Sequence, residues 1–552
     1  MEALDWLVIG VFFLALIGII VWVVRQKQND SADYFLGGRD ATWLAIGASI
    51  FASNIGSEHL IGLAGAGASS GMAMAHWEIQ GWMILILGWV FVPFYTRSMV
   101  YTMPEFLERR YNPQSRTILS VISLVSYVLT KVAVTVYAGG LVFQQVFGIK
   151  ELWGIDFFWI AAIGLVVLTA LYTIFGGMKS VLYTSVLQTP ILLLGSLIIL
   201  VLGFKELGGW DEMMRVCGAV TVNDYGDTMT NLIRSNDDAN FPWLGALIGS
   251  AIIGFWYWCT DQFIVQRVLS GKNEMEARRG TIFGAYLKLL PVFLFLIPGM
   301  IAFALHQKYI GAGGEGFLPM LANGTANADA AFPTLVAKLL PVGVKGLVVC
   351  GILAALMSSL AALFNSSAML FTIDFYKRFR PETPEKKLVG IGQVATVVIV
   401  ILGILWIPIM RSVGDVLYTY LQDVQSVLAP GIAAAFLLGI CWKRTSAQGG
   451  MWGLIAGMVI GLTRLGAKVY YSNAGEVADS TFKYLFYDMN WLFFCGWMFL
   501  FCIIVVIVVS LATKAPTAEK IQGLVFGTAT KEQKAATRAS WNHWDIIHTV
   551  II

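Results

Sequence analysis

Side chains able to bind a solute or an ion appear within the stretch Ala48–Gly71, ASIFASNIGSEHLIGLAGAGASSG. The stretch lies inside the apolar segment 42–71, yet it carries Asn54, Glu58 and His59, followed by a run of Gly, Ala and Ser. Ionisable side chains inside a membrane helix are costly and normally face a cavity or a partner. Gly and Ser allow local unwinding where the bare backbone lines a cavity. We therefore expect a broken helix that holds a solute and a cation. A packing stripe of small residues is the alternative, but it leaves the two ionisable side chains unexplained.

A second candidate is Glu78 in MAHWEIQGW, flanked by Trp77 and Trp82. A buried carboxylate accepts paired hydrogen bonds from a polyol, and aromatic rings cover the apolar face of a sugar. The alternative is a structural carboxylate paired with a lysine. Lys288, deep in IFGAYLKLLPVFLF, is such a lysine, because a buried ammonium must meet a carboxylate or carbonyl groups. Both interpretations stay open.

A third cluster joins three successive aromatic residues, Trp256, Tyr257 and Trp258, to Asp261. Aromatic triplets also form belts at membrane interfaces. This triplet begins too deep in its span to be only a belt. We expect a solute platform or gate at Tyr257 and a structural charge, paired nearby, at Asp261.

Ser358 and Ser359 form a fourth cluster in the middle of an apolar span. Hydroxyl and carbonyl oxygens suit a weakly held monovalent cation, whereas Mg²⁺ or Ca²⁺ require several carboxylates. Taken alone, the serines are better explained by bonds to carbonyl groups of their own helix.

The fifth cluster places Gln422 and Gln425 shortly before Pro430 and Gly431, which indicates a second discontinuous helix. The five polar clusters fall in spans whose order allows two related halves, a pattern typical of alternating access around a site at the membrane midplane.

The composition of the chain is that of a membrane protein. Of 552 residues, 57% are hydrophobic and 13% charged, whereas soluble domains have about a quarter charged residues. The net charge of +3, without a basic run, predicts no nucleic-acid partner. No Cys/His cluster, nucleotide loop or nucleophile–base pair suggests an enzyme. Acidic Glu2 and Asp5 precede the first span and no cleavage site follows, so this span is retained.

Hydropathy predicts an all-α polytopic membrane protein with about 13 complete spans. The final stretch, Trp541–Ile552, resembles the opening of another span, which gives about 14 in the full protein. The complete spans lie near 6–24, 42–71, 76–96, 117–147, 155–175, 180–203, 242–266, 281–305, 341–373, 389–410, 415–440, 450–470 and 489–513.

The charges of the loops predict the orientation. Lys and Arg concentrate in alternate loops, which are cytoplasmic by the positive-inside rule, so the N-terminus lies outside. We expect short helices or lids in the two long outer insertions, Lys205–Pro242 and His306–Pro341, and no regular periodicity in the polar tail Lys514–Asn542. The basic loops are Arg25–Arg39, Arg97–Arg116, Arg267–Arg279, Lys377–Lys387 and the one with Lys443 and Arg444.

The chain resembles the sodium:solute symporters, specifically the sodium/glucose (sodium/galactose) cotransporters. The resemblance extends from about Asp33 to Thr513 and implies the LeuT-like fold of five-plus-five inverted repeats. The matching segments are DYFLGGR, GASIFASNIGSEHLIGLAG, YTMPEFLERRY, LYTIFGG, WYWCTDQFIVQR, YLKLLPV, LPVGVKGL, MSSLAALFNS, LFTIDFYKR and FLLGICWKR.

This resemblance implies a division of the chain into six regions. An extra transmembrane helix with a cytoplasmic loop precedes the first repeat, and an extracellular loop separates the two repeats. C-terminal helices and a polar tail with the start of a last helix follow. The regions are 1–41, 42–203 (first repeat), 204–241, 242–440 (second repeat), 441–513 and 514–552.

The resemblance also implies roles for individual residues. Sodium would bind the carbonyls of Ala52, Ile55 and Ala355 and the hydroxyls of Ser358 and Ser359. A half-helix that exposes its negative C-terminal carbonyls to the two serines suits a cation. The sugar site would comprise Asn54, His59, Glu78, Lys288 and Gln422, with Tyr257 as inner gate beside Trp258, and the outer gate would comprise Leu63, Trp77 and Tyr418.

Some positions depart from the family's pattern. His59 resembles the glucose-type members, whereas Gly254 and Thr419 replace polar residues that contact the sugar in relatives. Ser185 replaces a common Asp, and Ala361 replaces a hydroxyl residue of relatives that bind two sodium ions. We therefore expect one sodium per sugar, while Glu58 is left as a structural partner for a nearby donor.

The implied function is sodium-coupled symport of a neutral hexose into the cell across the plasma or inner membrane. The partners are the sugar, the sodium ion and membrane lipid; the sequence predicts no oligomeric state. A sugar sensor that binds without net transport is one alternative. A symporter for another solute, such as inositol or sialic acid, is the other, although Glu78 in the pocket favours a neutral polyol.

Overall fold

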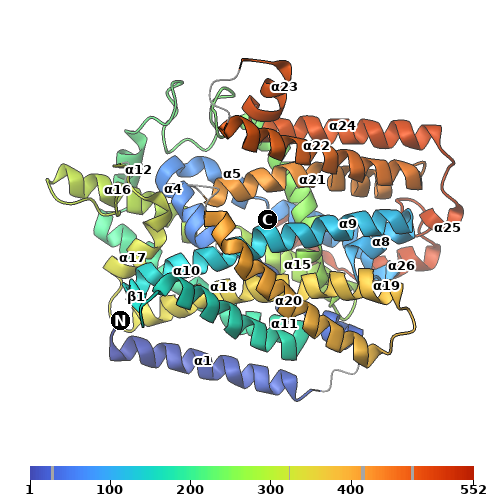
Figure 1. The fold of residues 1–552 in the computed structure, drawn as a ribbon, viewed down its shortest axis with the longest axis horizontal. Coiled ribbons are helices and arrows are strands. Elements are labelled where there is room, and N and C mark those ends of the chain that lie inside the picture. Colours follow the sequence, from blue (N-terminus) through green and yellow to red (C-terminus); the bar gives the residue numbers. More distant parts are fainter. Residues whose placement is uncertain (27–29, 57, 322–323, 412–416, 474–477) are drawn as a thin grey trace.

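The structure is a computed structural model that describes residues 1–26, 30–56, 58–321, 324–411, 417–473 and 478–552, without the side chains of 128–130, 409–411, 417–421, 423 and 473. Long helices lie roughly along one axis of the molecule (Figure 1). Within the described residues, ten helical segments are long and apolar enough to cross a membrane. The predicted all-α membrane class is confirmed, while the number of crossings stays a prediction.

The described residues of the first half contain helices α1 to α15 and a short antiparallel hairpin, β1 (Glu151–Leu152) and β2 (Ile155–Asp156). The helices are α1 (Ala3–Val24), α2 (Ser31–Leu36), α3 (Trp43–Asn54), α4 (Ala64–Ser70), α5 (Ala75–Glu78), α6 (Gly81–Ile86), α7 (Val92–Ser98), α8 (Met103–Arg110), α9 (Pro113–Ser126), α10 (Ala133–Phe147), α11 (Phe157–Leu207), α12 (Trp210–Gly218), α13 (Trp243–Phe255), α14 (Gln262–Leu269) and α15 (Glu274–Lys288).

The second half contains α16 (Ile297–Gly311), α17 (Ala331–Leu339), α18 (Val344–Met369), α19 (Lys377–Phe379), α20 (Glu385–Arg411), α21 (Leu417–Cys441), α22 (Ala447–Asn473), α23 (Thr481–Lys483), α24 (Trp491–Ala512), α25 (Ala518–Ile521), α26 (Lys531–Ala539) and α27 (His543–Ile551).

Short 3₁₀ and π-helical turns join these helices. The 3₁₀ turns are η1 (Gly37–Arg39), η3 (Gly71–Met74) and η8 (Ala328–Ala330). The π-helical turns are η2 (Glu58–Leu63), η4 (Leu87–Phe91), η5 (Tyr127–Val132), η6 (Trp256–Thr260), η7 (Val292–Leu296), η9 (Leu370–Tyr376) and η10 (Tyr484–Asp488).

The centre of the molecule is formed around α18, which is buried along nearly its whole length and packs against α11. By contrast, α1 lies at the periphery (Figure 1) and exposes Leu7, Leu14 and Ile17. An apolar helix with such an exposed face is suited to contact with lipid.

Two helices break beside the centre. α3 ends at Asn54, Ile55 has extended backbone angles (φ −77°, ψ 100°), and the chain becomes helical again at Glu58. This confirms the predicted broken helix. A second break lies at Asp261 (φ −77°, ψ 127°), between η6 and α14, where the Asp261 side chain caps α14 by accepting a bond from the Phe263 N–H. The sequence predicted one uninterrupted span, 242–266, at this place.

The interruption predicted near Pro430 and Gly431 is wrong, because α21 continues from Leu417 to Cys441 through both residues. A proline inside a helix removes one hydrogen bond, which bends a helix without necessarily ending it. The glycine serves packing instead. A Cβ at Gly431 would lie 2.9 Å from the Cα of Gly457, so α21 and α22 approach each other closely there.

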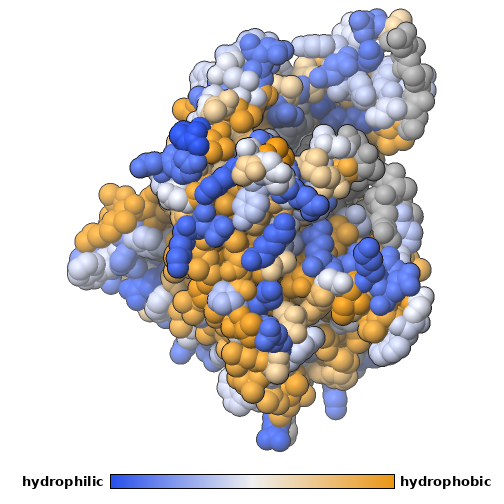
Figure 2. Space-filling view, turned by 90° about the vertical axis from the view of Figure 1, so that its left-hand side faces the viewer, coloured by the Kyte–Doolittle hydropathy of each residue, from blue (hydrophilic) through white to orange (hydrophobic). Residues whose placement is uncertain are grey.

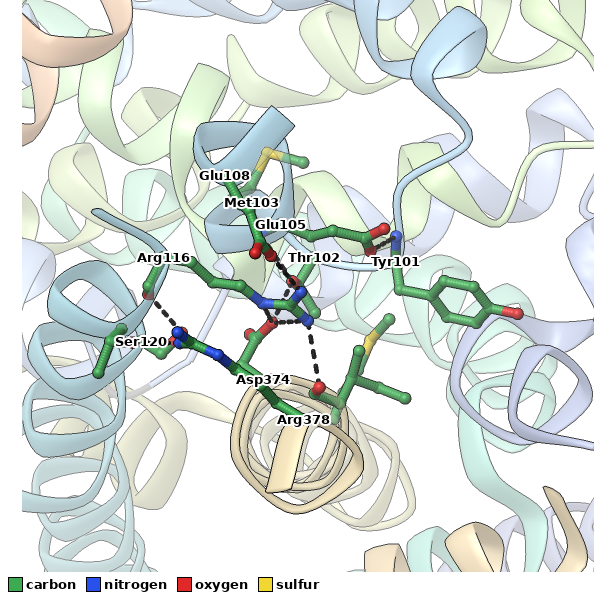
Figure 3. A network of polar contacts seen from close by, with 12 residues as sticks. Tyr101, Thr102, Met103, Glu105, Glu108, Arg116, Ser120, Asp374 and Arg378 are labelled. Carbon is green, nitrogen blue, oxygen red and sulfur yellow. Dashed lines mark hydrogen bonds and ion pairs between the residues drawn. The ribbon is translucent and has the colours of Figure 1, made fainter. Parts of the chain in front are cut away.

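On the side of the molecule where α8 and α19 lie (Figure 1), a polar network ties α8 and α9 to η9 (Figure 3). The Arg116 guanidinium donates to the buried Asp374 carboxylate (2.7 Å) and to Glu108 (2.6 Å), and Thr102 donates to Asp374 as well (2.9 Å). Hydrogen-bonded ion pairs at helix ends fix the relative position of the elements they join.

The opposite end carries the two long insertions. They contain the expected short helices, α12 in the first and η8 and α17 in the second. Figure 2 faces this end and shows hydrophilic side chains interleaved with hydrophobic ones.

The C-terminal segment is more regular than predicted. α26 begins with a capping box formed by Thr530 and Gln533. Arg97 donates to Thr537 (2.6 Å), and Arg279 pairs with Asp545 on α27 (3.0 Å). These contacts hold the segment against α7 and α15.

Two glycines allow α4 to touch the start of α16. A Cβ at Gly67 would lie 2.2 Å from the Leu296 carbonyl oxygen, and one at Gly299 would lie 2.0 Å from the Ala64 carbonyl oxygen. Small residues at such crossings are typical of membrane helices.

We expect Gly299→Ala to destabilise the protein by about 1–3 kcal/mol, because an added methyl group must push the α4 backbone away. Gly164→Ala is the matched control, since no atom lies within 4 Å of a Cβ there. Thermal unfolding of the two purified variants in the same detergent is the measurement, and equal melting temperatures would contradict the expectation.

Candidate solute and sodium site

A small internal cavity lies beside both helix breaks. The centre of a water-sized sphere can move through about 20 Å³ of this cavity. This is room for one or two water molecules. A larger solute therefore requires the walls to move apart. The lining residues are Asn54, Glu58, His59, Trp77, Glu78, Gln80, Ile253, Gly254, Tyr257, Trp258, Lys288 and Gln425.

Glu78 is the centre of a buried polar network in this cavity. Its Oε2 accepts a bond from Lys288 Nζ (2.5 Å) and lies 3.2 Å from His59 Nε2. Lys288 also donates to Asn54 Oδ1 (3.3 Å), and the Asn54 amide donates to the Tyr257 hydroxyl (3.0 Å). The network thus joins α5, η2, α15, the end of α3 and η6.

The structure confirms the structural interpretation of Glu78, while its role in binding a polyol stays a prediction. Glu78 pairs with Lys288 as a structural charge, and it also lines the cavity. Among the described residues no group donates to its second oxygen, Oε1, which remains available to a hydroxyl donor. The Lys288 ammonium also lies 5.4 Å from the centre of the Trp258 ring.

Three lining residues were missed or misjudged from the sequence. Glu58 lines the cavity although no binding role was expected for it, and its interpretation as a structural partner stays a prediction. Gln80 was not recognised, although its position two residues after Glu78 was a usable signal. Gln425 lines the cavity, whereas Gln422 is buried, outside the lining set, with an unpartnered Oε1.

The aromatic cluster rests on a second buried ion pair. Lys131 Nζ lies 2.7 Å from Asp261 Oδ2 and 4.6 Å from the centre of the Tyr257 ring. The Tyr127 hydroxyl also donates to Asp261. The expected pairing of Asp261 is confirmed, and the Lys131 ammonium of the pair also contacts the Tyr257 ring.

The predicted gate residues are only partly grouped. Trp77 lines the cavity and packs against Trp491, with ring centres 5.7 Å apart. Leu63 is fully buried in η2. The side chain of Tyr418 lies outside the described residues. The gating roles stay predictions.

The predicted sodium residues come from two elements that lie side by side. Ala52 and Ile55 stand at the end of α3, where the last carbonyls of a helix lack following helical N–H groups. On α18, Ser359 Oγ would lie 3.0 Å from a Cβ at Gly56, so the serine faces the break. Ser358 Oγ lies 3.3 Å from Ser185 Oγ, and Ala355 is buried one turn earlier. Such a set of oxygen donors without a carboxylate fits a monovalent cation.

Comparison with known proteins identifies the family of this chain. The model of the sodium:solute symporter family matches residues 34–457. The mouse sodium/myo-inositol cotransporter 2 is 36% identical over 542 residues, which covers 96% of this chain and 80% of the relative. The zebrafish sodium/glucose cotransporter 4 is 35% identical over 560 residues, which covers 98% of this chain and 84% of the relative.

A solved structure shares the fold. The substrate-bound, outward-open state of a sodium-coupled sialic acid symporter aligns with a TM-score of 0.75 and 21% identity, covering 94% of this chain and 99% of that one. The fold is therefore LeuT-like, as predicted, and sodium is the coupling ion. The chain belongs to the sodium:solute symporter family and is a multi-pass membrane transporter that couples the movement of a solute to that of sodium.

Proposed function

We propose that the protein carries a neutral hexose of the glucose, galactose and mannose class into the cell together with sodium. The observation that carries this proposal is the environment of Glu78, which lines the cavity while its charge is balanced by Lys288. Asn54, His59 and the aromatic rings of Trp77 and Tyr257 surround it. Hydroxyl-directed polar groups beside aromatic faces suit a sugar.

The charges of the cavity oppose an anionic solute. Lys288 is the single Lys or Arg among the lining residues, and it already contacts Glu78. A carboxylate substrate would enter beside Glu58 and Glu78, where like charges repel it. This argues against sialic acid as substrate, although the sialic acid symporter shares the fold.

A second candidate substrate is myo-inositol. Several relatives at 36% identity are sodium/myo-inositol cotransporters. Inositol is a neutral ring of hydroxyl groups, so Glu78 and Asn54 could bind it by the same hydrogen bonds as a hexose.

In the proposed cycle, sodium binds between the end of α3 and Ser358 and Ser359, and it stabilises the arrangement that admits the solute. Trp77 and Tyr418 then close over the solute, and exit requires Tyr257 to leave Asn54. Sodium and solute are coupled because each favours the conformation that the other binds.

We further propose a ratio of one sodium per solute. Ser185 and the buried Ala361 supply neither a carboxylate nor a second hydroxyl for another ion. The reversal potential of transport in proteoliposomes gives this ratio, and a value of two would contradict it. We place the protein in the plasma or inner membrane with its N-terminus outside, as the basic loops indicate.

We expect sodium-dependent counterflow in proteoliposomes for at least one of glucose, galactose, mannose and myo-inositol, and none for sialic acid. Which of the four neutral solutes is exchanged fastest decides between a hexose and inositol as substrate. Accumulation distinguishes a transporter from a sensor, because a sensor would bind the solute without raising its internal concentration. Transport of sialic acid alone would refute the neutral-polyol proposal.

We expect Lys288→Met to abolish uptake and to destabilise the protein by about 3–5 kcal/mol, since it leaves Glu78 buried and unpaired. Adding Glu78→Gln should recover most of the stability but no transport. Lys483→Met is the control, because its partner Asp479 is 94% exposed and a solvent-screened ion pair contributes little to stability. Thermal unfolding and uptake are measured on the same samples; restored transport in the double variant would contradict the assignment.

We expect Ser359→Ala to raise the sodium concentration for half-maximal uptake about fivefold or more, because one oxygen ligand is lost. Ser120→Ala is a matched control, since the Ser120 hydroxyl only bonds the Arg116 carbonyl of its own helix (2.8 Å). Uptake is measured over a sodium series at fixed solute. An unchanged sodium dependence would show that the ion binds elsewhere.

A further inference from the structure

Gln80 lies in the link between α5 and α6 and contributes a buried amide to the wall of the cavity. Its side-chain Nε2 donates to the carbonyl oxygen of Ser250 on α13 (3.0 Å). The residue is only 3% exposed. A buried amide has both donor and acceptor capacity to satisfy.

The amide occupies space that Gly254 leaves empty. A Cβ built on Gly254 would lie 2.3 Å from Gln80 Oε1 and 3.1 Å from Gln80 Cδ. Any side chain at position 254 would therefore displace the Gln80 amide. Its nearest other neighbour, Met83 Cγ at 3.4 Å, is at an ordinary contact distance. The Gln80 amide thus needs the space that the missing side chain of Gly254 leaves. A larger residue at position 254 would mainly displace this one amide.

The acceptor end of Gln80 is not used by the protein. Among the described residues no N–H or O–H group donates to Oε1, while Nε2 is held by Ser250. The contact with a carbonyl oxygen fixes which end of the amide is nitrogen. Oε1 therefore stands in the cavity wall, two residues along the chain from Glu78, with unused capacity for a hydroxyl donor.

We propose that Gln80 is a substrate-binding residue and that Gly254 determines specificity by admitting its amide to the cavity wall. Gln80 Oε1 accepts a hydrogen bond from one hydroxyl of the solute, beside the hydroxyls bound by Glu78. This inference rests on the proposed transport of a neutral polyol and names a further contact of that same site.

Gln80→Met tests the contact, because it keeps the length of the side chain and removes the amide. We expect the KM for the preferred solute to rise about three- to tenfold, with the maximal rate and the sodium dependence within about twofold of wild type. Gln393→Met is the matched control: Gln393 also donates to a helix carbonyl, that of Ile174 (3.0 Å), but lies on α20 outside the lining set.

Gly254→Ala tests whether the position of the Gln80 amide depends on the space at Gly254, without changing Gln80 itself. The added methyl group meets only the movable end of the amide, so the variant should fold and show a similar rise in KM. With Gln80→Ala as background, Gly254→Ala should add little, because the displaced amide is gone. Additive effects of the two changes on KM would contradict the proposed dependence of the Gln80 amide on Gly254.

Monodeoxy analogues of the preferred solute identify the hydroxyl. One analogue should bind wild type more weakly than the parent solute, yet bind Gln80→Met as well as the parent does. An unchanged KM in Gln80→Met for every transported solute overturns this inference and leaves the proposed function intact. Wild-type protein that neither transports nor binds any neutral polyol overturns the proposed function itself.

Discussion

The pair formed by Lys288 and Glu78 is the interaction on which the centre of this transporter depends. Removing two charges from water costs several kcal/mol per ion, and only a close, hydrogen-bonded contact recovers that cost. The pair therefore holds α15 and α5 in register across the cavity. His59 and Asn54 extend it to η2 and to the end of α3. Charge balance at the pair also supports the proposal of a neutral solute.

The helix breaks make this arrangement possible. At Ile55 and Asp261 the backbone leaves the helical conformation, and π-helical turns lie next to both breaks, at η2 and η6. Such turns are frequent at functional sites, because the widened turn points side chains in new directions. His59 and Tyr257 line the cavity from these turns, while Ser359 on α18 lies beside Gly56, next to the end of α3. In the proposed sites, solute and ion share this broken helix, which gives a physical basis for their proposed coupling.

Much of the site could be predicted from residue type alone. An ionisable or amide side chain inside an apolar span must have a partner or a cavity, and this reasoning found Asn54, His59, Glu78 and Lys288. The same reasoning failed where the signal was ambiguous. Pro430 and Gly431 were interpreted as a helix break. A Pro–Gly pair that only bends a helix and allows close packing has the same sequence as one that interrupts it.

The sequence by itself determined the membrane class, the broken helix within Ala48–Gly71 and the types of side chain in the site. Hydropathy and the cost of buried polar groups depend on composition along the chain. Only the tertiary structure decided which of these groups meet. Three features depend on helices far apart in the chain: the contact of Gln80 with Ser250, the space at Gly254, and the presence of Gln425 rather than Gln422 in the cavity wall. Such contacts depend on how helices rotate and pack against one another, which local sequence patterns do not encode.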